Sequence, residues 1–165
     1  ESLVHQPFQS LSNAMSTYTG QNVGAHDQER VKKGFRRGVT MAVIFALTML
    51  LVMHTLGQKI CLLFVNDPDV IKIGAKALTI TSLAYTGLGM IYIPRGLLNG
   101  AGDTGFSMIN GICEVIVRIS GALILTQTAL GYWGVWWTNC ITWTVTGIVC
   151  LIRYWSGVWK KKAVV

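Results

Sequence analysis

The sequence predicts an all-α membrane protein, built as a polytopic bundle of transmembrane helices. The clearest sign is the run of residues 39–58, which has no charged side chain and follows a basic segment that includes Arg30, Lys33 and Arg37. An apolar helix of about 20 residues crosses the roughly 30 Å hydrocarbon core of a bilayer. Charged residues make up 13% of the chain and apolar residues 52%, whereas about a quarter of the residues in a soluble domain are charged. We therefore expect the chain to lie within a membrane.

Five helices are expected within one membrane domain that covers residues 1–165. They span about residues 2–22, 39–65, 70–99, 104–126 and 132–155. Asp67 and Pro68 predict the start of the third helix, because aspartate caps helix N-termini and proline is favoured at the first position. Pro94 predicts a kink or an early end in the same helix, since proline removes one backbone donor. Residues 23–38 form a predicted basic cytoplasmic loop.

The first predicted helix carries a polar stripe. Gln6, Gln9 and Asn13, followed by Ser16 and Gly20, recur at helical spacing. In a membrane helix such a stripe faces other helices or a water-filled cavity. The alternative is that this segment is soluble or lies at the membrane interface.

The distribution of basic residues predicts the orientation. Counting spans places the basic loop at residues 23–38 and the cluster at residues 160–162 on the same side of the membrane. Cytoplasmic segments are enriched in Lys and Arg. We therefore expect a multi-pass protein of the plasma or inner membrane, with membrane lipids as partners and a cytoplasmic C-terminus.

Other classes of function have little support in the sequence. The net charge is +7, but the basic residues stand at the ends of apolar runs instead of covering a soluble face, so nucleic acid is not an expected partner. The four cysteines and three histidines show no metal-ligand spacing. Because no nucleotide or nucleophile motif appears either, we expect neither an enzyme nor a cofactor.

Three segments carry a resemblance to a known family. Residues 20–38 resemble the end of the eighth helix and the following cytoplasmic loop of the multidrug and toxic compound extrusion (MATE) transporters. Residues 96–104, GLLNGAGDT, are similar to that family's turn between the tenth and eleventh helices. Residues 131–136, GYWGVW, are similar to its entry into the twelfth helix. The three segments occur in the family's order, with matching numbers of helices between them.

The resemblance implies a fold and a function for the parent protein. The fold is a twelve-helix transporter of two six-helix lobes, and this chain is most of the second lobe. The function is secondary active antiport, which exports cationic or amphipathic drugs in exchange for Na⁺ or H⁺. The N-terminal lobe, absent from this chain, is then a partner. Some Na⁺-coupled members carry an acidic residue in the tenth helix, which residues 77–94 lack, so the coupling ion stays open.

The turn at residues 96–104 has a structural interpretation of its own. Gly96 belongs to the motif, and Gly100 and Gly102 permit positive φ angles or a close approach of two backbones. Asp103 can cap the helix that begins near residue 104.

Glu114 and Arg118 are the leading candidates for the ion or substrate pathway. They lie one turn apart within the predicted span 104–126, and their spacing lets them pair. A charge inside a membrane span is costly and marks a functional candidate. Asn110 extends the same helix face. The alternative is an ion pair that only fixes helix packing.

Polar and aromatic stripes on two further helices are also candidates for the lining of a cavity. These residues are Tyr85 and Tyr92 in the helix at 70–99, and Asn139 and Thr142 in the last helix. Such side chains suit bulky, weakly specific cations. They also form hydrogen bonds between packed helices, and this reading is equally favoured.

Two alternative functions remain for the parent protein. A lipid-linked precursor flippase has a similar two-lobe architecture but needs a more cationic cavity, and Arg118 is taken to be the only basic residue deep in a span. The other alternative is a truncated membrane remnant that does not transport.

Overall fold

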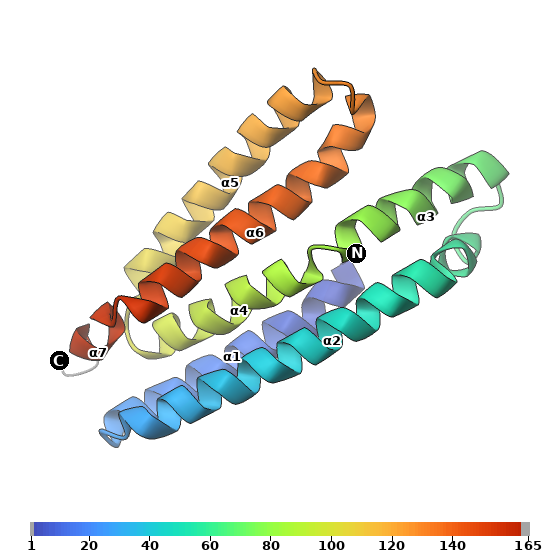
Figure 1. The fold of residues 1–165 in the computed structure, drawn as a ribbon. Coiled ribbons are helices and arrows are strands. Elements are labelled where there is room, and N and C mark those ends of the chain that lie inside the picture. The colour runs from blue at the N-terminus through green and yellow to red at the C-terminus, as the bar shows by residue number, and fades with distance from the viewer. Residues whose placement is uncertain (1, 163–165) are drawn as a thin grey trace.

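The computed structural model describes residues 2–162, with side chains up to Lys160, as a bundle of helices (Figure 1). In chain order these helices are α1 (Ser2–Gly24), α2 (Gln28–Leu62), α3 (Pro68–Ser82), α4 (Tyr85–Gly100), α5 (Thr104–Thr126), the 3₁₀ helix η1 (Gly131–Trp133), α6 (Gly134–Trp155) and α7 (Val158–Lys162). The described residues contain no strand. The predicted all-α class is confirmed.

The predicted basic loop is wrong for residues 28–38, because they form the first three turns of α2. Asp27 accepts a hydrogen bond from the Arg30 amide at 2.9 Å and so caps the helix. Val31 and Phe35 are buried, and the Phe35 ring stacks on Tyr154 at 4.0 Å. Buried apolar side chains one turn apart stabilise this segment as a helix.

The N-terminal turns of α2 extend beyond a membrane core. A helix of 35 residues is about 50 Å long, whereas the hydrocarbon core is roughly 30 Å thick. In the first turn, Lys32 donates a hydrogen bond to Glu29 at 2.6 Å, and this bond lowers the pKa of the Glu29 carboxyl below its ordinary value. At its other end α2 stops at Leu62, three residues before the predicted end.

The predicted helix at residues 70–99 is two helices that meet at an angle of 49°. Its start is confirmed, since Asp67 caps α3 and Pro68 occupies the first turn. The break, however, follows Ser82, and Pro94 lies inside α4. The predicted early end of the helix at Pro94 is therefore wrong.

Side-chain hydrogen bonds to the backbone accompany this break. The Thr81 hydroxyl donates to the Ala77 carbonyl and the Ser82 hydroxyl to the Thr79 carbonyl, both at 2.8 Å. Hydroxyl groups that bond to carbonyls of the preceding turn compete with the helix and bend it. The Leu83 amide then bonds three residues back, to Ile80, as in a tightened final turn.

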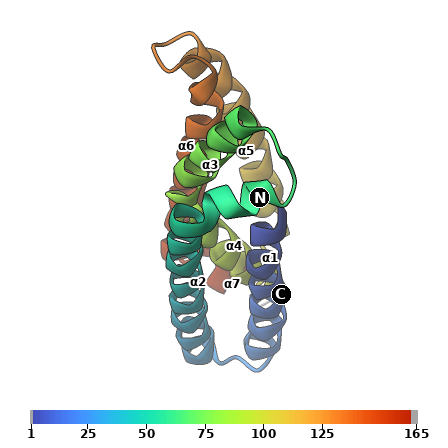
Figure 2. The same ribbon diagram turned by 90° about the vertical axis from the view of Figure 1, so that its right-hand side faces the viewer.

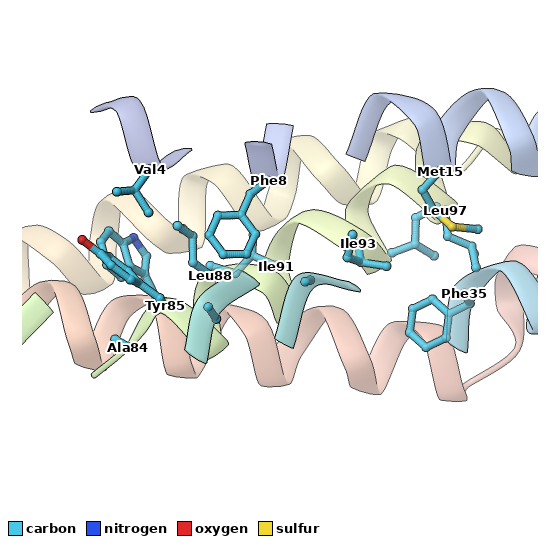
Figure 3. Packing of buried hydrophobic residues seen from close by; sticks show 14 of the residues in the cluster. Val4, Phe8, Met15, Phe35, Ala84, Tyr85, Leu88, Ile91, Ile93 and Leu97 are labelled. Carbon is cyan, nitrogen blue, oxygen red and sulfur yellow. The ribbon is translucent and has the colours of Figure 1, made fainter. Parts of the chain in front are cut away.

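Helix α4 is the centre of the bundle. It contacts α1, α2, α5 and α6, and Figure 2 shows it between α1 and α2. Its buried residues are Tyr85, Leu88, Gly89, Ile91, Ile93, Pro94, Gly96, Leu97 and Leu98. In Figure 3, Phe8 of α1 lies beside Leu88 and Ile91 of α4. The core is therefore built around α4, the second half of the broken helix.

Two glycines allow α1 and α4 to pack closely. A Cβ atom on Gly96 would collide with the backbone of Ser12, and one on Gly100 would collide with the backbone of Ser16. Glycines four residues apart bring membrane helices into backbone contact. Gly100 therefore serves a close approach, whereas Gly102 has a positive φ of 83° in the turn that follows.

Asp103 plays a different role from the predicted one. It occupies the N-cap position of α5, but its side chain makes no capping bond. Its buried carboxylate pairs with Arg153 of α6, with Nε at 2.8 Å and Nη2 at 3.2 Å. The Arg153 guanidinium also lies 5.2 Å from the Phe106 ring. Asp103 thus joins the α4–α5 turn to the end of α6.

Three helices are long and apolar enough to cross a membrane: α2, α5 and the η1–α6 segment. The bent pair α3–α4 counts as a fourth if it forms one span. Helix α5 has one buried residue, and most of its exposed side chains are apolar, as expected for a helix that faces lipid. These side chains are Met108, Ile109, Ile112, Val115, Ile116, Ile119, Leu123 and Ile124.

The helix ends fall into two groups. The α1–α2 turn, the α4–α5 turn and α7 lie at one end of the molecule, and the α2–α3 and α5–α6 connections lie at the other end (Figure 1). The basic first turns of α2 and Lys160 therefore share one end. The side chains of Lys161 and Lys162, and residues 163–165, lie outside the described residues. A cytoplasmic C-terminus stays a prediction.

The close approach of α1 and α4 predicts a stability difference between glycines. Gly96→Ala or Gly100→Ala in the full-length protein should cost about 1–3 kcal/mol, because the added methyl group overpacks the interface. The measurement is the thermal midpoint of unfolding in detergent. Gly105→Ala is the control, since a Cβ at Gly105 meets no atom within 4 Å. Equal midpoints for all three variants would contradict the packing.

Candidate functional site

The predicted pairing of Glu114 with Arg118 is confirmed, and a third charged residue joins it. Arg118 Nη2 donates to Glu114 Oε1 at 3.0 Å. Arg95 Nη2, from α4, donates to Glu114 Oε2 at 3.4 Å. The Arg95 and Glu114 side chains are 24% and 23% exposed, whereas that of Arg118 is 47% exposed. We call Arg95, Glu114 and Arg118 the charge cluster.

The charge cluster carries more positive than negative charge. One carboxylate pairs with two guanidinium groups, so the formal charge of the cluster is +1. The buried Nε atom of Arg95 has no acceptor within the described residues. Both oxygens of Glu114 are already engaged. Glu114 is thus a shared partner of two arginines and not an unpaired counter-charge for a cation.

Sequence reasoning missed Arg95. Residues 77–94 contain no charged side chain. The kink expected at Pro94 separates Arg95 from this apolar segment. Because α4 continues to Gly100, Arg95 lies well inside it. The view that Arg118 is the only basic residue deep in a span is therefore wrong.

Asn110 lies on the same face of α5, one turn before Glu114. It is fully buried, and neither polar atom of its amide has a hydrogen-bond partner among the described residues. One turn closer to the N-terminus of α5, the Ser107 hydroxyl donates a hydrogen bond to the side-chain oxygen of Asn99 at 2.5 Å. The sequence did not predict this contact. Polar side chains thus follow α5 from its N-terminus to Arg118.

The polar stripe of α1 lies on the exposed side of that helix. Gln6, Gln9 and Asn13 are exposed, and the Gln9 amide donates to the Asn13 side chain at 3.1 Å. The opposite face packs against the bundle through Val4, Phe8, Ser12, Met15 and Thr19. The stripe is therefore free to contact groups outside this chain.

One cavity brings three of the predicted residues together. It has a volume of about 300 Å³ and is lined by Ser2, His5, Gln6, Arg118, Asn139 and Trp143. Gln6, Arg118 and Asn139 come from α1, α5 and α6, and all three were predicted. His5 was not predicted, because a single histidine in a polar segment forms no recognisable motif. We call this space the Arg118 cavity.

The remaining predicted residues lie elsewhere. Gln9 and Asn13 are on α1 beyond the cavity, and Tyr85 is buried beside Trp143, with ring centres 6.4 Å apart. Tyr92 packs against the rings of His5 and Phe8. Thr142 is buried, and its hydroxyl has no partner among the described residues.

The Arg118 cavity is therefore a small polar site with a cationic edge. Aromatic rings line or back its wall, since the His5 ring meets Trp143 edge-on at 5.3 Å. No group of three or more His, Cys, Asp or Glu residues suited to a metal ion occurs in the described part of the chain. The site can bind and orient a charged group.

Comparisons with known proteins place the chain in a family. Residues 1–124 match the family model MatE. The chain is 26% identical to the probable multidrug resistance protein YoeA of Bacillus subtilis over 99% of its own length and 35% of that protein. It is 25% identical to human multidrug and toxin extrusion protein 1 over 96% of its length and 28% of that protein.

A third relative is named FAD transporter, from Shewanella oneidensis. It is 23% identical over 91% of this chain and 33% of its own length. This chain thus spans about a third of the length of the relatives it matches. Since the family model covers most of the chain, the chain belongs to the MatE (MATE) family of membrane proteins.

Proposed function

We propose that the protein containing this chain is a secondary active antiporter, which exports cationic or amphipathic compounds in exchange for Na⁺ or H⁺. Family membership and relatives named for multidrug resistance or toxin extrusion support this proposal. The observation that carries it is the charge cluster within otherwise apolar helices. Ionisable residues inside membrane spans are costly, and they line substrate or ion pathways.

In this proposal the chain is most of one lobe of a two-lobe transporter. The missing N-terminal lobe completes the central cavity, and the exposed stripe of Gln6, Gln9 and Asn13 on α1 faces that cavity. Helices α2 and α5 contact membrane lipids through their apolar faces. The protein resides in the plasma or inner membrane, crosses it several times and has a cytoplasmic C-terminus.

A lipid-linked precursor flippase is a second candidate, and Arg95 favours it. Such a protein must hold a pyrophosphate group with basic residues, and the charge cluster has two arginines. One relative is named FAD transporter, and FAD also carries a pyrophosphate group. The flippase ranks second because two other relatives are named for multidrug resistance or for multidrug and toxin extrusion.

Transport by the full-length protein tests the proposal directly. In proteoliposomes, ethidium should move against an imposed Na⁺ or H⁺ gradient, because antiport couples its movement to that ion. Imposing each gradient alone identifies the coupling ion. Ethidium movement that ignores both gradients would contradict antiport. Movement of a fluorescent lipid-linked pyrophosphate between leaflets would instead support the flippase.

Removing the negative charge of the cluster should slow the export of cations. Glu114→Gln leaves Arg95 and Arg118 with two net positive charges, and we expect ethidium efflux to fall about tenfold or more. The double variant Arg95→Gln with Glu114→Gln restores one net charge and should recover part of the efflux. Efflux and the yield of folded protein are measured together. Normal efflux by Glu114→Gln would show that the cluster takes no part in transport.

A further inference from the structure

The Arg118 cavity has the size and shape of a site for part of a ligand. Its volume of about 300 Å³ is at the lower limit for pockets that hold small molecules. It accommodates one ring or one charged group, and a larger compound would extend beyond it. Three helices contribute to its wall, through Gln6 of α1, Arg118 of α5 and Asn139 of α6.

The charges at this cavity favour an anion. Arg118 lines the cavity, half of its side chain is exposed, and one of its nitrogens is bonded to Glu114. A guanidinium group has five N–H donors, so Arg118 keeps donors available beyond that bond. The second arginine of the cluster, Arg95, balances Glu114 from the opposite side. Among the residues that the structure describes, the cavity therefore borders on one positive charge that the cluster does not compensate.

The other lining groups suit the acceptor atoms and the flat body of an organic anion. The side-chain amides of Gln6 and Asn139 can each donate to an oxygen atom. The rings of His5 and Trp143 form part of the wall. A cation placed here would meet Arg118, and the nearest carboxylate in the described cluster, Glu114, has both oxygens engaged.

We propose that the Arg118 cavity is the subsite that binds the carboxylate of amphipathic substrates, whether these are zwitterions or anions. Arg118 holds the carboxylate, as guanidinium groups do with planar anions. Gln6 and Asn139 add hydrogen bonds, and His5 and Trp143 contact the adjoining ring. The proposal rests on the proposed function, since only a transporter carries the compound onward from this site.

Two dyes that share a ring system test the proposal in the full-length protein. Fluorescein is anionic, whereas an esterified rhodamine has a similar xanthene body and is cationic. Binding is measured by fluorescence anisotropy in nanodiscs of zwitterionic phosphatidylcholine. Wild-type protein should bind fluorescein, and Arg118→Gln should weaken that binding about tenfold or more while the affinity for the rhodamine ester does not fall.

Two further variants and one control make the test specific. Arg118→Lys keeps the charge and should recover part of the affinity for fluorescein. Asn139→Asp adds a negative charge to the cavity and should weaken fluorescein binding but strengthen binding of the rhodamine ester. Lys59→Gln removes a basic residue remote from the cavity and should change neither affinity. If the Arg118→Gln variant does not fold, the result for Asn139→Asp decides whether the cavity binds the anion.

Several results would overturn the inference. They are absent fluorescein binding by wild-type protein, equal losses for both dyes in Arg118→Gln, and displacement of fluorescein when phosphatidylglycerol replaces part of the phosphatidylcholine. Absent binding would mean that the missing lobe supplies the anion for Arg118, and displacement would assign the cavity to a lipid. Ethidium transport is assayed separately. If it is absent while fluorescein still binds, the proposed function fails but the binding site stands.

Discussion

The Glu114 carboxylate, shared between Arg95 and Arg118, is the interaction on which the arrangement of the charged site depends. Helix α5 has one buried residue and packs mainly on α6, with fewer contacts to α4. The bond from Arg95 to Glu114 therefore ties a helix that mostly faces outward to the central helix of the bundle. In a medium of low dielectric constant such a tie is strong while all partners are present, and costly when one is removed.

The position of α4 sets the geometry of this tie. Gly96 and Gly100 allow α1 to approach the α4 backbone closely, and Arg95 stands beside Gly96 in the same turn. Just after the end of α4, Asp103 fixes the α4–α5 turn to α6 through Arg153. The polar groups of α1, α5 and α6 then meet at the Arg118 cavity. The described helices thus combine a buried apolar centre with a small polar cavity that Arg118 lines.

Much of this architecture follows from local sequence patterns. Apolar runs predict the spans, Asp67 predicts the start of α3, and the spacing of Glu114 and Arg118 predicts their ion pair. The sequence could not place Arg95 against Glu114, because they are 19 positions apart and meet only when α4 and α5 pack together. The pairing of Asp103 with Arg153, 50 positions apart, is beyond local reasoning for the same reason.

The extent of the helices depends on similar effects. Residues 28–38 looked like a loop because they are basic, yet two apolar side chains in them pack against the bundle. At the break after Ser82, hydroxyl groups bond to the preceding turn, and such residues are a weaker signal in a sequence than a proline. The Arg118 cavity needs three helices in contact, so only its separate residues were predictable.

A double-mutant cycle between Arg95 and Glu114 tests the central claim most directly. The free energy of unfolding of the full-length protein in detergent is measured for Arg95→Met, Glu114→Gln and the two combined. If Glu114 is shared as described, the double variant should lose about 1–3 kcal/mol less than the sum of the single variants. Additivity within about 0.5 kcal/mol would show that Arg95 and Glu114 do not interact and would contradict the account.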